Sequence, residues 1–146
     1  MKPIKIINGP NLNLLGLREP HVYGSATLSD IEALCTEIAS DLGVDFEFHQ
    51  SNHEGVIIDL IQEARERCSG IILNPAGFTS TSIAILDALL ASDLPIIEVH
   101  ITNIHRREEW RHLSYVSKAA TAIIAGAGPQ GYELALRHMS ALVARS

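Results

Sequence analysis

The sequence predicts one α/β domain over residues 1–146, in which helices cover both faces of a five-stranded parallel sheet. Expected strands and helices alternate five times along the chain, which is the pattern of parallel sheets with helical crossovers. Most of the expected strands are unbroken apolar runs, as in strands that are buried on both faces. A length of 146 residues also suits one domain with a proper core. Together these observations favour a doubly wound, flavodoxin-like order of strands.

The expected elements follow one another at short intervals. Strands are predicted at residues 4–8, 44–49, 70–74, 96–100 and 121–125, and helices at 29–42, after Ser51, at 82–91, near 108–113 and at 130–144. Two helix starts match the capping box, in which a serine and a glutamate three residues later bond each other's backbone amides. These pairs are Ser29 with Glu32 and Ser51 with Glu54.

Residues 9–26 form an unusually long connection between the first strand and the first helix. Most such loops contain about 2 to 6 residues, and longer ones are commonly lids or binding loops. Gly16 and Gly24 are candidate hinges for such a lid. The alternative is a packed surface loop that uses Leu12, Leu14 and Leu15 as anchors.

Composition and charge restrict the partners of this chain. The formal net charge is −6, which disfavours nucleic acid or an anionic membrane because both need a broad basic surface. No apolar run approaches the roughly 18 residues that span a bilayer, and the chain starts directly with a strand, so we expect a cytoplasmic protein. Cys35 and Cys68 fall in or beside expected helices and are predicted to be reduced core thiols.

The segment from Pro95 to Arg111 concentrates reactive side chains. Glu98 and His100 are two positions apart on an expected strand, so they point to the same face. The arginines that follow suit a small anionic substrate, because guanidinium groups match carboxylates with paired hydrogen bonds. Since parallel strands end at one edge of the sheet, the segments 8–11, 74–82 and 100–111 should converge on one crevice. The alternative is that Glu98 and His100 merely satisfy each other.

Other motifs carry less information. Residues 126–131 match the G-x-G-x-x-G pattern of dinucleotide-binding loops, but no further strand or acidic residue follows at the required distance. A tight turn is therefore preferred over nucleotide binding, and neither a cofactor nor a metal site is predicted. Tyr115 and Tyr132 are interpreted as packing residues.

Four sequence blocks resemble the signatures of the type II 3-dehydroquinate dehydratases. They are NGPNLNLLGLREPHVYG, NPAGFTSTSIAILDAL, EVHITNIHRREEWRHLSYVS and GAGPQGYELAL, in the order of that family and over nearly the whole chain. The resemblance implies a flavodoxin-like lyase that converts 3-dehydroquinate to 3-dehydroshikimate through an enolate, in the shikimate pathway of aromatic amino-acid biosynthesis. It also implies that the enzyme needs no metal or Schiff-base lysine and forms a dodecamer of four trimers.

The resemblance also implies catalytic roles for five residues. Tyr23 matches the base that removes a proton from C2 of the substrate. A phenol with an ordinary pKa of about 10 is protonated at neutral pH, and Arg18 matches the cation that activates it. Asn11 matches a residue that holds a water against the enolate. His100 matches the acid that protonates the departing hydroxyl, and Glu98 orients it.

Substrate binding is implied by the same matches, with some departures from the family pattern. Asn74, Ile101, Thr102 and Arg111 match positions that hold the carboxylate and ring hydroxyls, with Arg107 near the lid, and Asp87 matches a residue that reaches in from a neighbouring subunit. On its helix, Ile83, Leu86 and Leu90 face the core or a contact, and Leu86 stands where an arginine is usual.

Ser80 replaces a histidine that binds the ring hydroxyls, at a cost of about 1 to 3 kcal/mol. The alternative function is therefore a quinate-catabolic or low-activity paralogue that mainly binds the ring acid.

Overall fold

The centre of the molecule is a five-stranded, wholly parallel sheet with the strand order β2-β1-β3-β4-β5. The computed structural model describes residues 1–17 and 19–145. The strands are β1 (Ile4–Asn8), β2 (Phe46–Gln50), β3 (Gly70–Asn74), β4 (Ile96–His100) and β5 (Ala122–Ala125). This order confirms the predicted flavodoxin-like arrangement, and each strand begins within two residues of its expected start.

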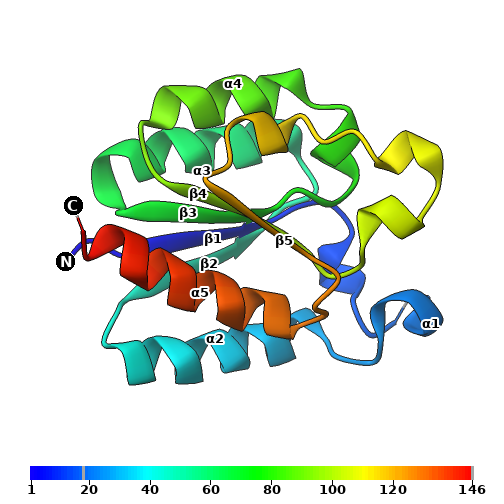
Figure 1. The fold of residues 1–146 in the computed structure, drawn as a ribbon, viewed down its shortest axis with the longest axis horizontal. Coiled ribbons are helices and arrows are strands. Elements are labelled where there is room, and N and C mark those ends of the chain that lie inside the picture. Colours follow the sequence, from blue (N-terminus) through cyan, green and yellow to red (C-terminus); the bar gives the residue numbers. More distant parts are fainter. Residues whose placement is uncertain (18, 146) are drawn as a thin grey trace.

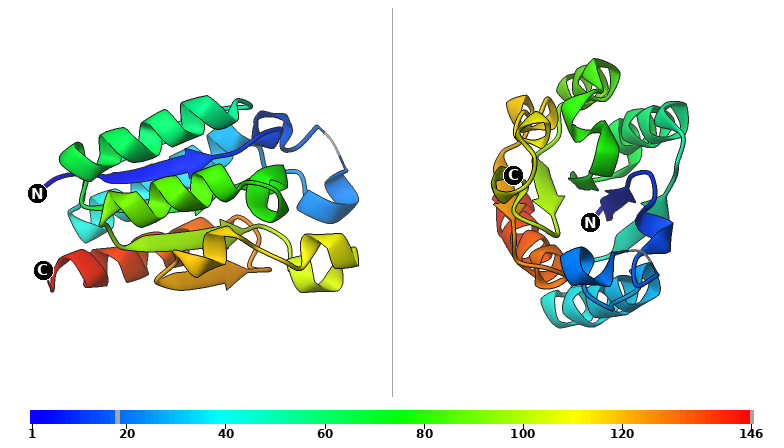
Figure 2. Two further views of the ribbon diagram at one scale, coloured as in Figure 1. Left: turned by 90° about the horizontal axis from the view of Figure 1, so that it is seen from above. Right: turned by 90° about the vertical axis from the view of Figure 1, so that its right-hand side faces the viewer.

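Helices cover both faces of the sheet, as predicted. α2 (Leu28–Leu42) and α5 (Gln130–Val143) lie together on one face, while α3 (Glu54–Arg67) and α4 (Ile83–Ser92) cover the other (Figure 1). The short α1 (Pro20–Tyr23) lies beyond the carboxyl end of the sheet. The two chain termini lie at the opposite end of the molecule (Figure 2).

The apolar strand runs are explained by this double cover. Adjacent residues of a strand point to opposite faces, so Ile72 packs under α2 and α5 while Ile71 and Leu73 pack under α3 and α4. All residues of β1, β3 and β4 are buried. The edge strands β2 and β5 are only partly covered, which is why the expected β2 alternates in sequence while the central strands do not.

Both predicted capping boxes are wrong. The box on α2 is formed two residues earlier, where Thr27 accepts from the backbone of Asp30 at 3.1 Å and Asp30 accepts from the backbone of Thr27 at 2.9 Å. At α3, Ser51 bonds the backbone of His53, and the Glu54 carboxylate accepts from Ser82 of the next helix at 2.5 Å. Tertiary contact has therefore replaced the local cap that the sequence pattern indicated.

The long connection after β1 is partly ordered by short helices. It contains a 3₁₀ turn (Leu12–Leu14) and α1, and it buries Leu12 and Leu15 while Leu14 stays exposed. The expected leucine anchors are thus confirmed for two of three positions. Further 3₁₀ turns follow β3 (Ala76–Ser80) and β4 (Ile104–Arg106, Glu109–Arg111 and Val116–Lys118). The first three of these turns lie at the carboxyl edge of the sheet, whereas Val116–Lys118 packs against α4.

Candidate active site

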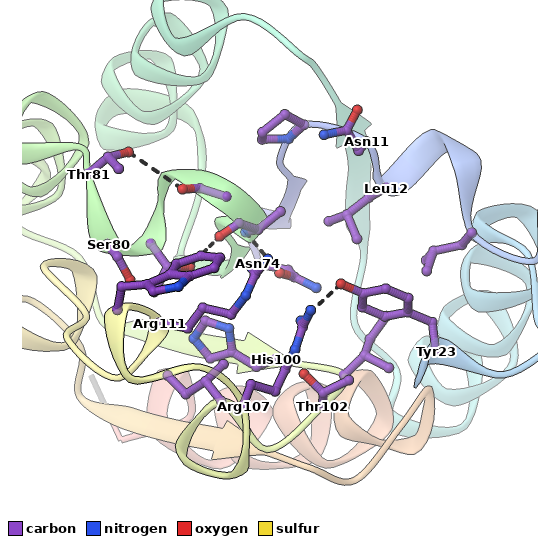
Figure 3. Close-up of a pocket in the computed structure, with 18 residues that line it drawn as sticks. Asn11, Leu12, Tyr23, Asn74, Ser80, Thr81, His100, Thr102, Arg107 and Arg111 are labelled. Carbon is purple, nitrogen blue, oxygen red and sulfur yellow. Dashed lines mark hydrogen bonds between the residues drawn. The ribbon is translucent and has the colours of Figure 1, made fainter. Parts of the chain in front are cut away.

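A cavity of about 430 Å³ opens at the carboxyl edge of the sheet. Segments that follow β1, β3 and β4 contribute its walls, as the topology predicted (Figure 3). The predicted site residues that line it are Asn11, Tyr23, Asn74, Ser80, His100, Ile101, Thr102 and Arg111. Its volume lies within the roughly 300–1,000 Å³ that is typical of sites for small molecules.

A buried acid–base pair forms one wall of the cavity. Glu98 and His100 share one face of β4, where the Glu98 carboxylate bonds His100 Nε2 directly. Ser114 and Ser117 also donate to this carboxylate, at 2.8 and 2.5 Å. Burial opposes ionisation of Glu98, but the hydrogen bonds from His100 and the two serines hold its pKa below the ordinary value of 4.5. An ionised carboxylate therefore fixes the ring of His100, whose Nδ1 is left for other partners.

A phenol and a guanidinium meet at the mouth of the cavity. Arg107 donates from Nη1 to the Tyr23 hydroxyl oxygen at 2.9 Å, and its Cζ lies 5.4 Å from the centre of the Tyr23 ring (Figure 3). This contact places a positive charge beside the phenol oxygen. Arg18, which the resemblance assigned to this role, lies outside the described residues. The contact with Arg107 joins positions 84 residues apart, so no local pattern could have indicated it.

Asn74 at the end of β3 is almost fully buried and faces the same cavity. Its side-chain oxygen accepts from the backbone of Ala76 at 3.2 Å, and its Nδ2 donates to the hydroxyl of Tyr132 at 3.0 Å. Tyr132 is a core residue, as predicted, but it also makes this polar contact with a cavity residue. The sequence analysis missed the second role because Tyr132 is on α5, far along the chain.

The hydroxyl hydrogens of the Thr79-Ser80-Thr81 segment are bonded to backbone oxygens. Ser80 donates to the backbone oxygen of Leu113 at 2.6 Å, and Thr79 donates to that of Ala76 at 2.6 Å. Thr81 donates to Gly77 at 3.5 Å, a longer contact. Ser80 therefore lines the cavity as a hydrogen-bond acceptor, whereas an imidazole at this position would reach further toward a ligand.

Trp110 and Arg111 complete the wall opposite Tyr23. The Arg111 Cζ lies 4.3 Å from the Trp110 ring centre, and its Nε donates to Glu108 at 2.9 Å. This stacking and the ion pair hold the guanidinium at the cavity, where it provides a positive charge for an anionic ligand.

The glycine turn at residues 126–131 supports β4 rather than a nucleotide. The amide of Gly126 donates to the His100 carbonyl at 3.2 Å, and that of Gly128 donates to the Ile101 carbonyl at 3.0 Å. Gly131 donates to Gly128 at 3.0 Å. Because protein carbonyls already occupy these amides, they do not form the phosphate cradle of a dinucleotide loop, and the preferred interpretation as a tight turn is confirmed.

Two predicted site residues lie away from the cavity wall. Glu98 stands behind His100 and bonds its Nε2. Asp87 is exposed on α4 and does not line the cavity of its own chain. Cys35 and Cys68 are buried and unpaired, as predicted, and burial raises the pKa of Cys35 to about 12.

Two searches of residues 1–17 and 19–145 concern other classes of site. In this part of the chain, no three His, Cys, Asp or Glu side chains come together as ligands for a metal ion. None of its helices combines the length and apolar character that crossing a bilayer requires.

The fold and cavity together define an α/β protein that presents a phenol and a carboxylate-bound imidazole at one cavity. Comparison with known proteins identifies the family. Residues 2–140 match the family model of the class II dehydroquinases (Dehydroquinase class II). The chain belongs to this family.

Individual relatives are similar to this chain over most of the length of both proteins. The chain is 54% identical to the 3-dehydroquinate dehydratase 2 of Pseudomonas putida, over 98% of this chain and 97% of that protein. It is 57% identical to the catabolic 3-dehydroquinase of Penicillium rubens, over 94% and 89%. The type II dehydroquinase of Propionibacterium acnes superposes with a TM-score of 0.93 at 44% identity, covering 97% of both chains.

Proposed function

We propose that the chain is a hydro-lyase that converts 3-dehydroquinate to 3-dehydroshikimate by trans elimination of water. The observation that carries this function is the placement of two acid–base groups on one cavity, the Tyr23 phenol beside Arg107 and the His100 imidazole on Glu98. The relatives named as 3-dehydroquinate dehydratases and 3-dehydroquinases support the substrate. The alternative of a quinate-catabolic or low-activity paralogue that mainly binds the ring acid gains no support from the comparisons.

Proton removal is the first step of the proposed reaction. Tyr23, as the phenolate, takes a proton from C2, next to the C3 ketone, and an enolate forms. The Arg107 guanidinium lies 2.9 Å from the hydroxyl oxygen and places a positive charge beside it. The role that resemblance gives to Arg18 adds a second cation on the loop of Tyr23.

Loss of hydroxide from C1 is the second step. The C3 ketone is restored as the enolate collapses, the C1–C2 double bond forms, and the C1 hydroxyl leaves as water after His100 gives it a proton. Glu98 holds the ring for this transfer and stabilises the imidazolium. Asn11 holds a water against the enolate oxygen in this scheme. Its left-handed backbone, with φ of 69°, is fixed by an Asn52 side chain that accepts from the Asn11 amide at 3.0 Å.

The substrate is oriented by polar groups on the opposite wall. In this proposal Asn74, the segment Ile101–Thr102 and Arg111 hold the carboxylate and the ring hydroxyls, and all of them line the cavity. Ser80 replaces the usual imidazole and offers an acceptor, because its hydrogen is bonded to Leu113. Without the imidazole, a ring hydroxyl of the substrate loses a hydrogen-bond donor, which lowers transition-state stabilisation by about 1 to 3 kcal/mol. We therefore propose that this enzyme is slower than relatives that have histidine at this position.

The direct test is the conjugated enone of the product, which absorbs in the ultraviolet. Purified chain mixed with 3-dehydroquinate, without metal or cofactor, should give rising absorbance. Tyr23→Phe should lose the roughly 10²- to 10⁴-fold that a general base contributes. Tyr115→Phe, which removes a phenol hydroxyl from outside the cavity lining, serves as the matched control and should keep its rate. An unmodified chain without turnover, or a Tyr23→Phe variant with full turnover, contradicts the proposal.

We also propose that the active unit is a cytoplasmic dodecamer of four trimers in which Asp87 completes a neighbouring site. On α4, Ile83 and Leu90 are 56% and 59% exposed on the same side as Asp87, and such an apolar stripe supports a subunit contact. Light scattering of the purified protein measures the assembly mass. A monomer that is fully active would contradict both the assembly and the shared role of Asp87.

A further inference from the structure

Tyr132 connects two asparagines in the interior, beneath the floor of the cavity. It is fully buried on α5, and its hydroxyl donates to Asn8 Oδ1 at 2.6 Å and accepts from Asn74 Nδ2 at 3.0 Å. Asn8 in turn donates from Nδ2 to the backbone oxygen of His49 at 3.0 Å. Asn74 accepts at Oδ1 from the backbone N–H of Ala76 at 3.2 Å. The result is a continuous chain of hydrogen bonds across β2, β1 and β3.

The direction of this chain is fixed at both ends by backbone groups. The His49 carbonyl can only accept, so Asn8 must turn its NH₂ toward it and present Oδ1 to Tyr132. The Ala76 amide can only donate, so Asn74 must turn its oxygen toward it. The Tyr132 hydroxyl fits between the two amides because it donates on one side and accepts on the other. No member of the chain can be reversed alone without opposing like groups.

The fixed direction decides what Asn74 shows to the cavity. An amide nitrogen has two hydrogens, of which one is used by Tyr132. The second hydrogen is left for a ligand oxygen in the cavity that Asn74 lines. If the amide rotated by half a turn, an oxygen would face the ligand instead and would repel a carboxylate. Burial raises the pKa of Tyr132 well above its usual range, so its hydroxyl stays protonated while the base of the reaction works.

We infer that Tyr132 is a positioning residue that locks the Asn74 amide with an N–H directed at an oxygen acceptor of the substrate, a carboxylate in the first place. This inference rests on the proposed function and deepens it. Tyr132 itself does not line the cavity, so it acts only through Asn74. The carboxylate lies away from the bonds that change, so the lock contributes to binding more than to the chemical step.

Tyr132→Phe removes the hydroxyl and keeps the ring in the core. We expect KM to rise by roughly 5- to 150-fold, the range for one unpaired hydrogen bond, with kcat changed much less. Asn74→Ala should raise KM similarly, and adding Tyr132→Phe to Asn74→Ala should change KM by less than about twofold, because coupled residues do not act additively. A merely structural tyrosine would instead raise KM by the same factor in both backgrounds, and that result overturns the inference.

Asn8→Ala provides a second route if Tyr132→Phe does not fold. It removes the acceptor of the Tyr132 hydrogen, which can then turn toward Asn74, so KM should again rise while kcat stays near that of the parent. The affinity for 3-dehydroshikimate gives an independent readout. It can be measured by tryptophan fluorescence, since Trp110 is the one tryptophan of the chain and lines the cavity. Product affinity equal to the parent's in folded Tyr132→Phe or Asn8→Ala overturns the inference. Absence of turnover by the parent would instead refute the proposed function.

Discussion

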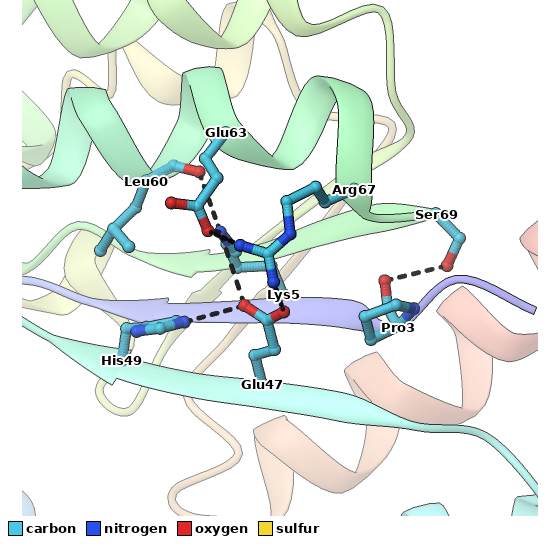
Figure 4. Close-up of polar contacts among 8 residues, drawn as sticks. All are labelled: Pro3, Lys5, Glu47, His49, Leu60, Glu63, Arg67 and Ser69. Atoms are coloured by element: carbon cyan, nitrogen blue, oxygen red, sulfur yellow. Dashed lines mark hydrogen bonds and ion pairs between the residues drawn. The ribbon is translucent and has the colours of Figure 1, made fainter.

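Two charge clusters of this molecule, each built around one buried ionisable residue, resemble each other in composition but differ in what they offer to the cavity. One is the Glu98–His100 pair on β4. The other, the Lys5 cluster, consists of Lys5, Glu47, His49, Glu63 and Arg67 between β1, β2 and α3 (Figure 4). Each contains a fully buried ionisable residue, Glu98 in the first and Lys5 in the second.

The Lys5 cluster satisfies itself. The Lys5 ammonium has three hydrogens and three oxygen neighbours, on Glu63 at 2.8 Å, on the Leu60 backbone at 3.3 Å and on Glu47 at 3.5 Å. Arg67 pairs with both glutamates, at 2.8 and 3.5 Å. None of the five members of the cluster lines the active-site cavity. Such a closed network can stabilise the fold but offers nothing to a ligand.

The Glu98–His100 pair is closed on one side and open on the other. Glu98 is surrounded by three donors, whereas His100 has one ring nitrogen on Glu98 and a place on the cavity wall. A buried charge therefore indicates chemistry only where one member of its network faces a cavity. A sequence that contains both clusters does not distinguish them.

The largest expected effect is on activity at the open cluster. His100→Ala should lower kcat by about 10²- to 10⁴-fold, because the departing hydroxyl loses its acid. The free energy of unfolding in urea should fall by only about 1 to 3 kcal/mol, since the Glu98 carboxylate loses one hydrogen bond while Ser114 and Ser117 still bond it. The enone assay and a urea titration measure the two effects. An active His100→Ala variant would remove the distinction between the clusters.

The reciprocal control is Lys5→Ala at the closed cluster. Loss of its buried stem should lower the free energy of unfolding by about 2 to 5 kcal/mol, the range for deleting a long side chain from a core. Lys5→Met keeps the stem and should cost less, which separates packing from charge. Both variants should keep the kcat of the parent while folded. A loss of kcat without loss of stability would show that the Lys5 cluster also serves the reaction.

A smaller effect concerns the pH dependence of stability, to which both clusters contribute. Hydrogen bonding from His49 lowers the pKa of Glu47 below its ordinary value of 4.5. The hydrogen bonds around Glu98 likewise lower the pKa of that carboxyl. A depressed pKa stabilises the fold above the unfolded-state value, and this contribution is lost as the pH falls through the folded-state pKa. The stability of the parent should therefore decrease below about pH 4.5.

Glu98→Gln and Glu47→Gln should each make that acid decrease shallower. Thermal unfolding between pH 3 and 7 (roughly the window on either side of an ordinary carboxyl pKa) measures the slope. Glu98→Gln alone should also lower kcat, because the carboxylate that orients His100 is lost. Equal kcat losses in the two variants would show that the two clusters do not differ in their role in the reaction.

Much of the fold followed from local patterns, and the errors have a shared cause. The apolar runs 4–8, 70–74 and 96–100 predicted the central strands because burial on both faces leaves no room for polar alternation. The capping pairs at Ser29 and Ser51 failed because neighbouring polar groups compete for the same amides. The Glu54 carboxylate accepts a hydrogen bond from Ser82 on another helix instead of capping its own helix.

The sequence by itself determined the sheet, the edge at which the cavity lies, and the pair Glu98 and His100, because these depend on the period of a strand and on the direction of parallel strands. Only the tertiary structure decided that Arg107 bonds Tyr23 and that Tyr132 bonds Asn74, across 84 and 58 positions of the chain. It also decided that the Lys5 cluster is closed. Contacts of this kind depend on which side chains the packing brings within hydrogen-bond distance, and no local period records that.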